Sequence, residues 1–377
     1  EIGSMANNSK MSFEFVGNLS LAEDTDKSLH YEVRDFTRDD GSKNELKTLK
    51  LTMKCGDDSF SLRLQGWGGD TIYTLDKTFK KLTFPAKEYE KHLDDIANFK
   101  KFTFNDGESR YEFAREFEFI DYLNTKLKDN PYGNRLFKVN GEVEMSSYED
   151  KEGNTKTFTN YKVQRIYVAD ENGILRDKEL VVHAKANVVG YIDHKALDET
   201  ELAEKNKLNI TYYLGQFDSK KKKAGMLPER GFVRHATYEV SDDPYKKAKQ
   251  VSVLKEKIFR CDEDTLAMTG FSVNLINRGG KVEFDESMLT EEEKEFIELD
   301  FCTFEDIKKE HEFGISEYIT GEEICGFKKP YLSTGSDQTK ITLKELLATD
   351  QDKVQESFEV VDEDDEFGDL FGDDLPF

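Results

Sequence analysis

Cysteine, tryptophan and proline are scarce in this chain of 377 residues, which has four Cys, one Trp and six Pro. The cysteines lie far apart and form no CxxC pair, which argues against a disulfide framework and favours reduced thiols. Six scattered histidines show no zinc-site spacing such as HExxH, and neither a P-loop nor a nucleophile elbow is present. We therefore expect no metal, no cofactor and no enzymatic activity.

The sequence also lacks a long hydrophobic run. No apolar stretch approaches the roughly 20 residues that cross a bilayer, and there is no signal peptide. The first residues before Met5 resemble a cloning remnant, so we expect residues 1–11 to be a tag remnant and a disordered N-terminus. These features predict a cytoplasmic protein that does not associate with membranes.

Charge and aromatic rings are abundant instead. The net charge of -24 opposes bulk attraction to nucleic acid, whereas 28 Phe and 16 Tyr supply material for a core. The charge is uneven, since residues 350–377 hold twelve acids and one Lys. Residues 207–234 hold seven Lys or Arg and only two acids. A local basic groove is therefore compatible with an acidic protein.

The first third of the chain shows the period-two pattern of half-buried strands. Apolar and polar residues alternate over 13–21, 49–53 and 60–64, and Gly56-Asp57-Asp58 predicts a hairpin between the last two runs. The spacing becomes helical over 86–99 and 111–127, where Phe113, Phe117, Ile120 and Leu127 would share one stripe.

A second strand-rich region begins after Asn130-Pro131. Its opening Val139-Asn140-Gly141-Glu142-Val143 echoes Phe15-Val16-Gly17-Asn18-Leu19, and glycine within a strand often marks a bulge or a bend in a small barrel. Several short strands with an interposed helix suit an OB-fold, although an ordinary antiparallel α+β domain would give the same pattern.

The predicted fold is mainly β with helices, built from two or more OB-like β-barrel domains and a disordered acidic C-terminal tail. We assign one OB-like domain with a helical element to 12–130 and a second OB-like domain to 131–244. Residues 245–350 are either an α+β extension or a third domain, with an acidic helix over 287–304 that Thr290 and Glu293 cap. Residues 351–377 form the protein-interaction tail.

The most specific feature is the end of this tail. Asp373-Asp374-Leu375-Pro376-Phe377 resembles the acidic tip of bacterial single-stranded-DNA-binding proteins, with Leu375 where that family usually has Ile. The terminal ring suits an apolar pocket, and its free carboxylate can pair with an Arg or Lys beside it. The two acids would steer the tip to a basic rim. The alternative is a merely solvated acidic tail that ends in Phe.

The opening Phe15 to Leu19 also resembles the first strand of this family, whose usual chain is about half this length. The chain looks like an enlarged version with two OB-like units, for which a phage source is one interpretation. The resemblance implies sequence-independent binding of single-stranded DNA in replication, recombination or repair. It also implies that the tip recruits replication and repair proteins, in a bacterial cell or a phage-infected bacterium.

Single-strand binding needs rings on which bases stack, next to cations that follow the phosphates. The candidates in the first region are Trp67, Phe60, Tyr31, Phe36, Arg34, Lys50, Lys54 and Arg63. Those in the second region are Tyr148, Phe158, Lys162, Arg165, Lys220, Lys221, Lys222 and Lys223. For each ring the alternative is burial in the core, and for the four lysines it is a solvated loop. Strand alternation predicts that Arg165 faces the same way as Tyr161 and opposite to Lys162.

Two other functions remain open at this stage. The chain could be a protein-interaction factor that uses the tip to bind host replication or repair proteins without touching DNA, which its negative charge favours. It could also be a DNA-processing enzyme with a docking tail.

Overall fold

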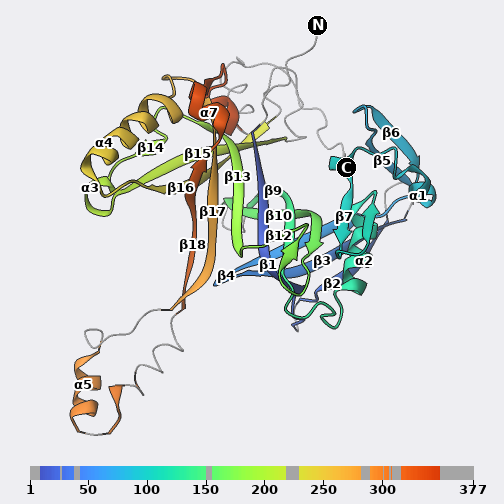
Figure 1. The fold of residues 1–377 in the computed structure, drawn as a ribbon, viewed down its shortest axis with the longest axis horizontal. Coiled ribbons are helices and arrows are strands. Elements are labelled where there is room, and N and C mark those ends of the chain that lie inside the picture. The colour runs from blue at the N-terminus through green and yellow to red at the C-terminus, as the bar shows by residue number, and fades with distance from the viewer. Residues whose placement is uncertain are drawn as a thin grey trace, which may run out of the picture.

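The computed structural model describes residues 9–25, 28–37, 43–149, 155–217, 229–281, 289–299, 301–304, 307 and 316–348. The fold is mainly β with helices and contains OB-like barrel architecture, as the sequence predicted. A 15-stranded sheet curls into two barrel units, one coloured blue to teal and the other green to red-orange in Figure 1. Residues 1–8 and the predicted disordered tail 351–377 lie outside the described residues. The prediction of disorder is wrong for Lys10 and Met11, which begin the first strand, because Met11 is buried in the core.

The first barrel contains five long strands. They are β1 (Lys10–Leu21), β3 (Lys43–Cys55), β4 (Asp58–Trp67), β9 (Phe137–Glu149) and β10 (Thr155–Val168). β1 pairs with β3 and β9, β3 pairs with β4, and β9 pairs with β10. Contact between β10 and β4 completes the ring, and helix α2 (Glu116–Lys126) packs against β3 and β4.

The second barrel repeats this order. Its strands are β13 (His183–Ile192), β15 (Lys207–Phe217), β16 (Glu229–Glu239), β17 (Ala267–Lys281) and β18 (Ser316–Phe327). β13 pairs with β15 and β17, β15 pairs with β16, β17 pairs with β18, and a parallel bridge joins β16 to β18. Helix α4 (Pro244–Val253) and the π-helical turn η4 (Leu254–Ile258) connect β16 to β17. Both units therefore have the five-stranded OB-like arrangement.

The remaining elements are short additions to these barrels. They are β2 (Tyr31–Thr37), β5 (Thr71–Leu75), β6 (Lys81–Pro85), η1 (Ala86–Glu88), α1 (Tyr89–His92), η2 (Asn98–Lys100), β7 (Phe102–Asn105), β8 (Arg110–Phe113), β11 (Ile174–Leu175), β12 (Lys178–Glu179), β14 (Leu197–Asp198), α3 (Leu202–Lys205), α5 (Glu291–Glu298), α7 (Lys329–Thr334), β19 (Asp337–Gln338) and α8 (Leu343–Leu347). Strand β2 widens the first barrel beside β3.

The two barrels are joined through their first strands. β1 pairs antiparallel with β13 over Lys10 to Val16, and one hydrophobic cluster continues from Phe15 in the first barrel to Tyr212 and Phe271 in the second. The sheet is therefore continuous, and the interior side chains of both barrels belong to one core.

Glycine permits two close backbone crossings at the positions that the sequence predicted as bends. A Cβ on Gly17 would lie 1.9 Å from the carbonyl oxygen of Lys54, and a Cβ on Gly141 would lie 1.9 Å from that of Lys162. At Gly17, β1 leaves β9 and β13 and continues beside β3. Any side chain there would push apart two strands of the barrel.

We expect Gly141→Ala to lower the free energy of unfolding by about 2–3 kcal/mol, because the added methyl group overlaps backbone that cannot rotate away. Urea unfolding checks this value. Gly321→Ala is the matched control, because no described atom lies within 4 Å of the position of its Cβ. Equal losses in both variants would contradict the proposed backbone overlap.

The predicted domain boundaries after residues 130 and 244 do not coincide with the barrels that the strand pairing defines. β9 and β10 follow residue 130 but belong to the first ring, whereas β17 and β18 follow residue 244 and belong to the second. In each barrel the helix lies between the third and fourth strands, so the break after a helix falls inside a domain. Residues 245–348 therefore supply two of the five long strands of the second barrel, β17 and β18.

The predicted helices are shorter than expected. Over 86–99 only η1, α1 and the first residues of η2 are helical, and Phe113 belongs to β8. The buried stripe of α2 consists of Phe119, Ile120 and Leu123. The predicted cap of α5 is confirmed, since Glu293 Oε2 accepts the backbone N–H of Thr290 at 2.8 Å.

No helix in the described ranges is both long enough and apolar enough to cross a membrane.

Candidate nucleic-acid interface

One outward face of the first barrel collects most of the candidates from the first region. Side chains of β3 and β4 alternate between the core and the outside, and Leu51 and Leu62 point inward as a directly opposite pair. The next pair along the strands, Lys50 and Arg63, therefore faces outward. We call the outward side of β2, β3 and β4 the β2–β3–β4 face.

Two aromatic rings lie together on this face. Trp67 ends β4 and is 51% exposed, and Phe36 on β2 is 40% exposed. Their ring centroids are 5.1 Å apart with the planes tilted by 55°. Aromatic surface left open to water next to a strand edge gives unpaired bases a place to stack.

Four cations share the face with these rings. Arg63 and Lys54 are exposed and have no ion-pair partner in the described part of the chain. Arg34 is also exposed, and its Nη2 lies 2.9 Å from Glu32. Lys50 is more constrained, since its Nζ donates to Glu32 at 3.0 Å and to Ser28 Oγ at 2.8 Å. The cations best placed for phosphates are therefore Arg63, Lys54 and Arg34.

Two predicted stacking residues face away from the β2–β3–β4 face. Phe60 is only 2% exposed and stacks on Phe15 inside the barrel, with ring centroids 4.5 Å apart. Tyr31 is half-buried, and its hydroxyl donates to Asp121 of α2 at 2.8 Å. Burial is the main reason why the pKa of Tyr31 rises to about 12. Both rings stabilise the barrel, because strand register points them inward.

A bulge in β10 reverses the predicted direction of Arg165. Val163 pairs with Gly141 and Arg165 pairs with Asn140, so Gln164 is an extra residue in the ladder. Arg165 therefore faces outward together with Lys162, whereas the prediction placed these two side chains on opposite faces. The Nη2 of Arg165 donates to the carbonyl oxygen of Asn98 at 3.5 Å.

The other second-region candidates do not form one surface in the described structure. Phe158 is 46% exposed on β10. Lys162 is part-buried, and its Nζ lies 3.2 Å from Glu144 in a cluster that also includes Glu116 and Glu142. The side chain of Tyr148, the basic loop Lys220 to Lys223 and the tip Asp373 to Phe377 lie outside the described residues.

Glu116 begins α2 beside the β2–β3–β4 face. Its Oε1 accepts the backbone N–H of Gln65 at 3.1 Å. Burial raises the pKa of this carboxyl to about 7, although Lys162 and the Gln65 N–H act in the opposite direction. The folded chain therefore holds this proton up to near neutral pH, whereas the unfolded chain releases it near the ordinary value of 4.5.

This difference predicts that stability falls as the pH rises from 4.5 to about 7, because the folded state then binds more protons than the unfolded state. Glu116→Gln should remove that slope and raise the free energy of unfolding near pH 8 by about 2 kcal/mol. Urea unfolding of both proteins across this pH range is the measurement. If the free energy of unfolding changed with pH in the same way in both proteins, the pH dependence would not come from Glu116.

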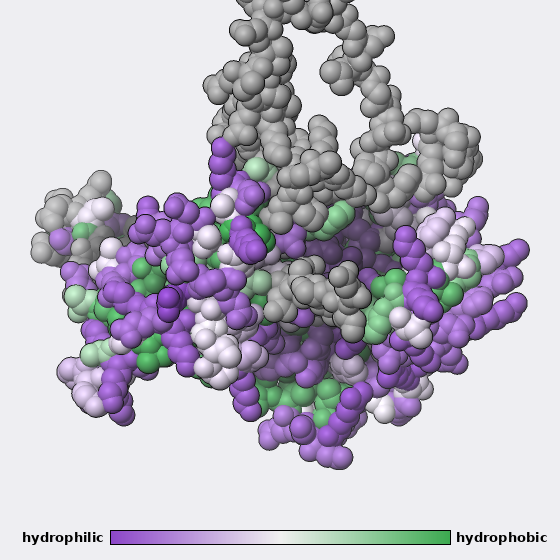
Figure 2. All heavy atoms as spheres, turned by 90° about the horizontal axis from the view of Figure 1, so that it is seen from above, coloured by the Kyte–Doolittle hydropathy of each residue, from purple (hydrophilic) through white to green (hydrophobic). Residues whose placement is uncertain are grey.

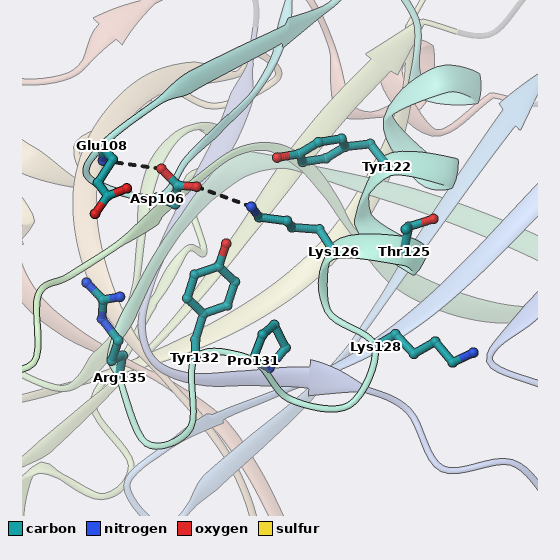
Figure 3. A pocket seen from close by; sticks show the side chains of 9 residues that line it. All are labelled: Asp106, Glu108, Tyr122, Thr125, Lys126, Lys128, Pro131, Tyr132 and Arg135. Atoms are coloured by element: carbon teal, nitrogen blue, oxygen red, sulfur yellow. Dashed lines mark hydrogen bonds and ion pairs between the residues drawn. The ribbon is translucent and has the colours of Figure 1, made fainter.

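A separate cavity lies beneath the C-terminal end of α2. It has a volume of about 440 Å³ and is lined by Asp106, Glu108, Tyr122, Thr125, Lys126, Lys128, Pro131, Tyr132 and Arg135 (Figure 3). Lys126 Nζ lies 3.3 Å from Asp106, so an anionic ligand would have to compete with a carboxylate already present. The β2–β3–β4 face has more exposed ring surface and is the stronger nucleic-acid candidate.

No family model matches this chain, and no curated protein matches it. Two solved structures of the single-stranded DNA binding protein from Thermus aquaticus show a weak structural similarity to this chain. A deletion mutant has 10% identity and a TM-score of 0.30, with 72% of this chain and 88% of that chain covered. The wild-type structure has 10% identity and a TM-score of 0.27, with 72% and 86% covered. The β2–β3–β4 face is defined by this chain's own strand register and side chains.

In the second barrel, β15 and β16 correspond to β3 and β4, and the outside of β16 is partly covered. α8 packs on the outside of β16, where a Cβ on Gly231 would lie 2.6 Å from Leu346. Leu346 is fully buried and shares a cluster with Tyr191, Tyr213, Leu266 and Met268. The two barrels therefore present different outer surfaces at these strands.

Sequence reasoning missed the residue that holds the turn after Trp67. Arg115 Nη1 donates to the carbonyl oxygen of Gly69 at 2.8 Å, while its Nε donates to Glu118 at 3.0 Å. The contact with Gly69 joins residues 46 positions apart, so no local pattern signals it.

On the side seen in Figure 2, hydrophobic patches are small and separated by hydrophilic residues.

Proposed function

We propose that this protein binds single-stranded nucleic acid without sequence preference, and single-stranded DNA in particular. The observation that carries the proposal is the exposed Trp67–Phe36 pair with Arg34, Lys54 and Arg63 on the same face. Rings offer stacking surfaces to any base, and the cations neutralise phosphates. The second and third strands of an OB barrel are a recurrent site for oligonucleotides.

The net charge of -24 limits non-specific attraction, so binding must depend on this local face. Stacking does not depend on net charge, whereas phosphate contacts produce a salt-dependent affinity. The proposed binding mode thus combines ring contacts that resist salt with a small number of cation contacts that weaken as salt rises.

Titration with oligo-dT at two salt concentrations tests the proposal. Trp67 is the only tryptophan, so its fluorescence should be quenched as bases stack on it. We expect saturable quenching at low salt and weaker binding at higher salt, together with similar affinity for oligo-dT and a mixed sequence. Unchanged fluorescence and mobility at saturating oligonucleotide would overturn the proposal and favour a protein-interaction factor that does not bind DNA.

The acidic tip supports a second part of the proposal, in which the tail recruits replication, recombination or repair proteins. The support comes from the sequence, where Asp373-Asp374-Leu375-Pro376-Phe377 combines a terminal ring, a free carboxylate and steering charges. A short tip that occupies a pocket forms a small interface, which depends on one or two anchor residues.

Phe377→Ala should abolish recruitment of partner proteins and leave DNA binding nearly unchanged, because truncating an anchor costs about 2 kcal/mol or more. Adding one Gly after Phe377 should be nearly as damaging, since it keeps the ring but moves the carboxylate. Titration of replication and repair proteins against the three forms is the measurement. Normal recruitment by the Gly extension would show that the terminal carboxylate is not recognised.

A further inference from the structure

The insertion between β4 and α2 carries a second group of exposed rings. Phe79 is 67% exposed and Phe99 is 43% exposed, and the two rings stack with centroids 5.7 Å apart and planes 27° from parallel. They are not part of the local core, which is formed by Ile72, Phe84, Ile96 and Ala114. Burial in the core therefore does not explain why these two large rings are present at the surface and stack on each other.

Several hydrogen bonds stabilise the turn that presents Phe79. Its backbone φ is +63°, which is uncommon for a bulky residue and costs free energy. The Asp76 carboxylate accepts the backbone N–H groups of Thr78 at 2.8 Å and Lys80 at 2.9 Å, and the N–H of Phe79 donates to the carbonyl oxygen of Asp76 at 2.9 Å. The local hydrogen bonds thus hold the ring outward despite the strain.

Long-range backbone contacts bring the second ring to the first. The N–H of Lys77 donates to the carbonyl oxygen of Asp95 at 3.1 Å, and the N–H of Ala97 donates to that of Leu75 at 2.9 Å. This pairing fixes the turn beside η2, which carries Phe99. The ring pair therefore has a defined position in the fold.

Lysines lie next to both rings in the sequence of an otherwise acidic protein. Residues 70–101 contain seven Lys and six acids, against a net charge of -24 for the whole chain. Lys77, Lys80 and Lys100 are exposed, and the Nζ of Lys100 lies 5.6 Å from the centroid of the Phe99 ring. Exposed rings beside cations match the chemistry of a polyanion that also carries aromatic bases.

The insertion is also connected to the first barrel's outer side. It starts three residues after Trp67, and Arg165 of β10 donates to the carbonyl oxygen of Asn98, the residue next to Phe99. We propose that Phe79 and Phe99 form a second base-stacking platform, which contacts the same single strand beyond the nucleotides held at Trp67 and Phe36. This inference rests on the proposed function and extends its footprint to the insertion.

A series of oligo-dT lengths tests the platform. The variant combines Phe79→Asn, which tolerates the positive φ, with Phe99→Ala. Short oligonucleotides should bind the variant as tightly as wild type, because they occupy only the β2–β3–β4 face. Long ones should bind about a hundredfold more weakly, since the variant has lost two stacking contacts. Tyr245→Ala is the matched control, because Tyr245 is 68% exposed beside Lys249 but lies on α4 of the second barrel.

Circular dichroism and thermal unfolding establish that the variant is folded, as expected for two exposed side chains. Equal affinity of variant and wild type at every length would overturn the platform and leave the proposed function intact. Failure of the wild type to bind any length would overturn the proposed function as well. As an independent measurement, photo-crosslinking of a long oligonucleotide should label the segment 73–101, and labelling confined to the β2–β3–β4 face would overturn the platform.

Discussion

Replacing Trp67 and Phe36 together by leucine is expected to weaken binding of single-stranded DNA by about a hundredfold, because each ring contributes about 1–3 kcal/mol of stacking. Both side chains are largely exposed and touch each other, so the substitution removes ring surface without opening the core. Anisotropy of a labelled oligonucleotide is the measurement, since the variant has lost its only tryptophan.

The salt dependence of this variant separates stacking from charge. Losing two neutral rings should leave the slope of log affinity against log salt concentration unchanged. Arg63→Gln should reduce the magnitude of that slope by about the contribution of one phosphate contact. Tyr245→Ala again provides an exposed aromatic control on the second barrel. A loss of less than threefold in the double variant would contradict the assignment of bases to this face.

A larger effect on folding is expected from Arg234→Met, which should lower the free energy of unfolding by about 3–5 kcal/mol. Arg234 and Glu322 form an ion pair inside the second barrel, with side-chain exposures of 11% and 8%. Tyr212 also donates to Glu322, at 2.6 Å. Without the guanidinium, a buried carboxylate would lose its compensating charge.

Arg234 also connects the barrels, since its Nη1 donates to Thr159 Oγ1 of β10 at 3.0 Å. Its loss should therefore destabilise both barrels together, and urea unfolding should still show one transition. The matched control is the double substitution Arg234→Met and Glu322→Leu, which should regain most of the stability because no buried charge is left unpaired. Equal stability of the single variant and the double variant would contradict this account.

Much of the fold could be predicted from the sequence because its signals are local. The alternation in β1, β3 and β4 reflects side chains that point in turn to the core and to solvent, and the hairpin at Gly56-Asp57 is confirmed. Gly17 and Gly141 were predicted as bends from their place inside apolar runs, and both allow a close backbone crossing. The capping box of α5 needs only two residues three positions apart.

The placement of the candidate rings was predictable only in part. Trp67 sits between Gly66 and Gly68-Gly69, which favours exposure, whereas Phe60 occupies the inward side of the same strand. The bulge at Gln164 shifts Arg165 by one position and so reverses its direction, which no composition rule reveals. The stacked pair of Phe79 and Phe99 joins residues from separate short elements.

The sequence by itself determined that this chain is rich in strands, that glycines bend two of them, and that residues 350–377 are strongly acidic. Those properties depend on residue type and on near neighbours. Only the tertiary structure decided that β9 and β10 complete the first barrel and that β17 and β18 complete the second. Pairing between distant strands sets the register, and register decides which rings and cations reach solvent on one face.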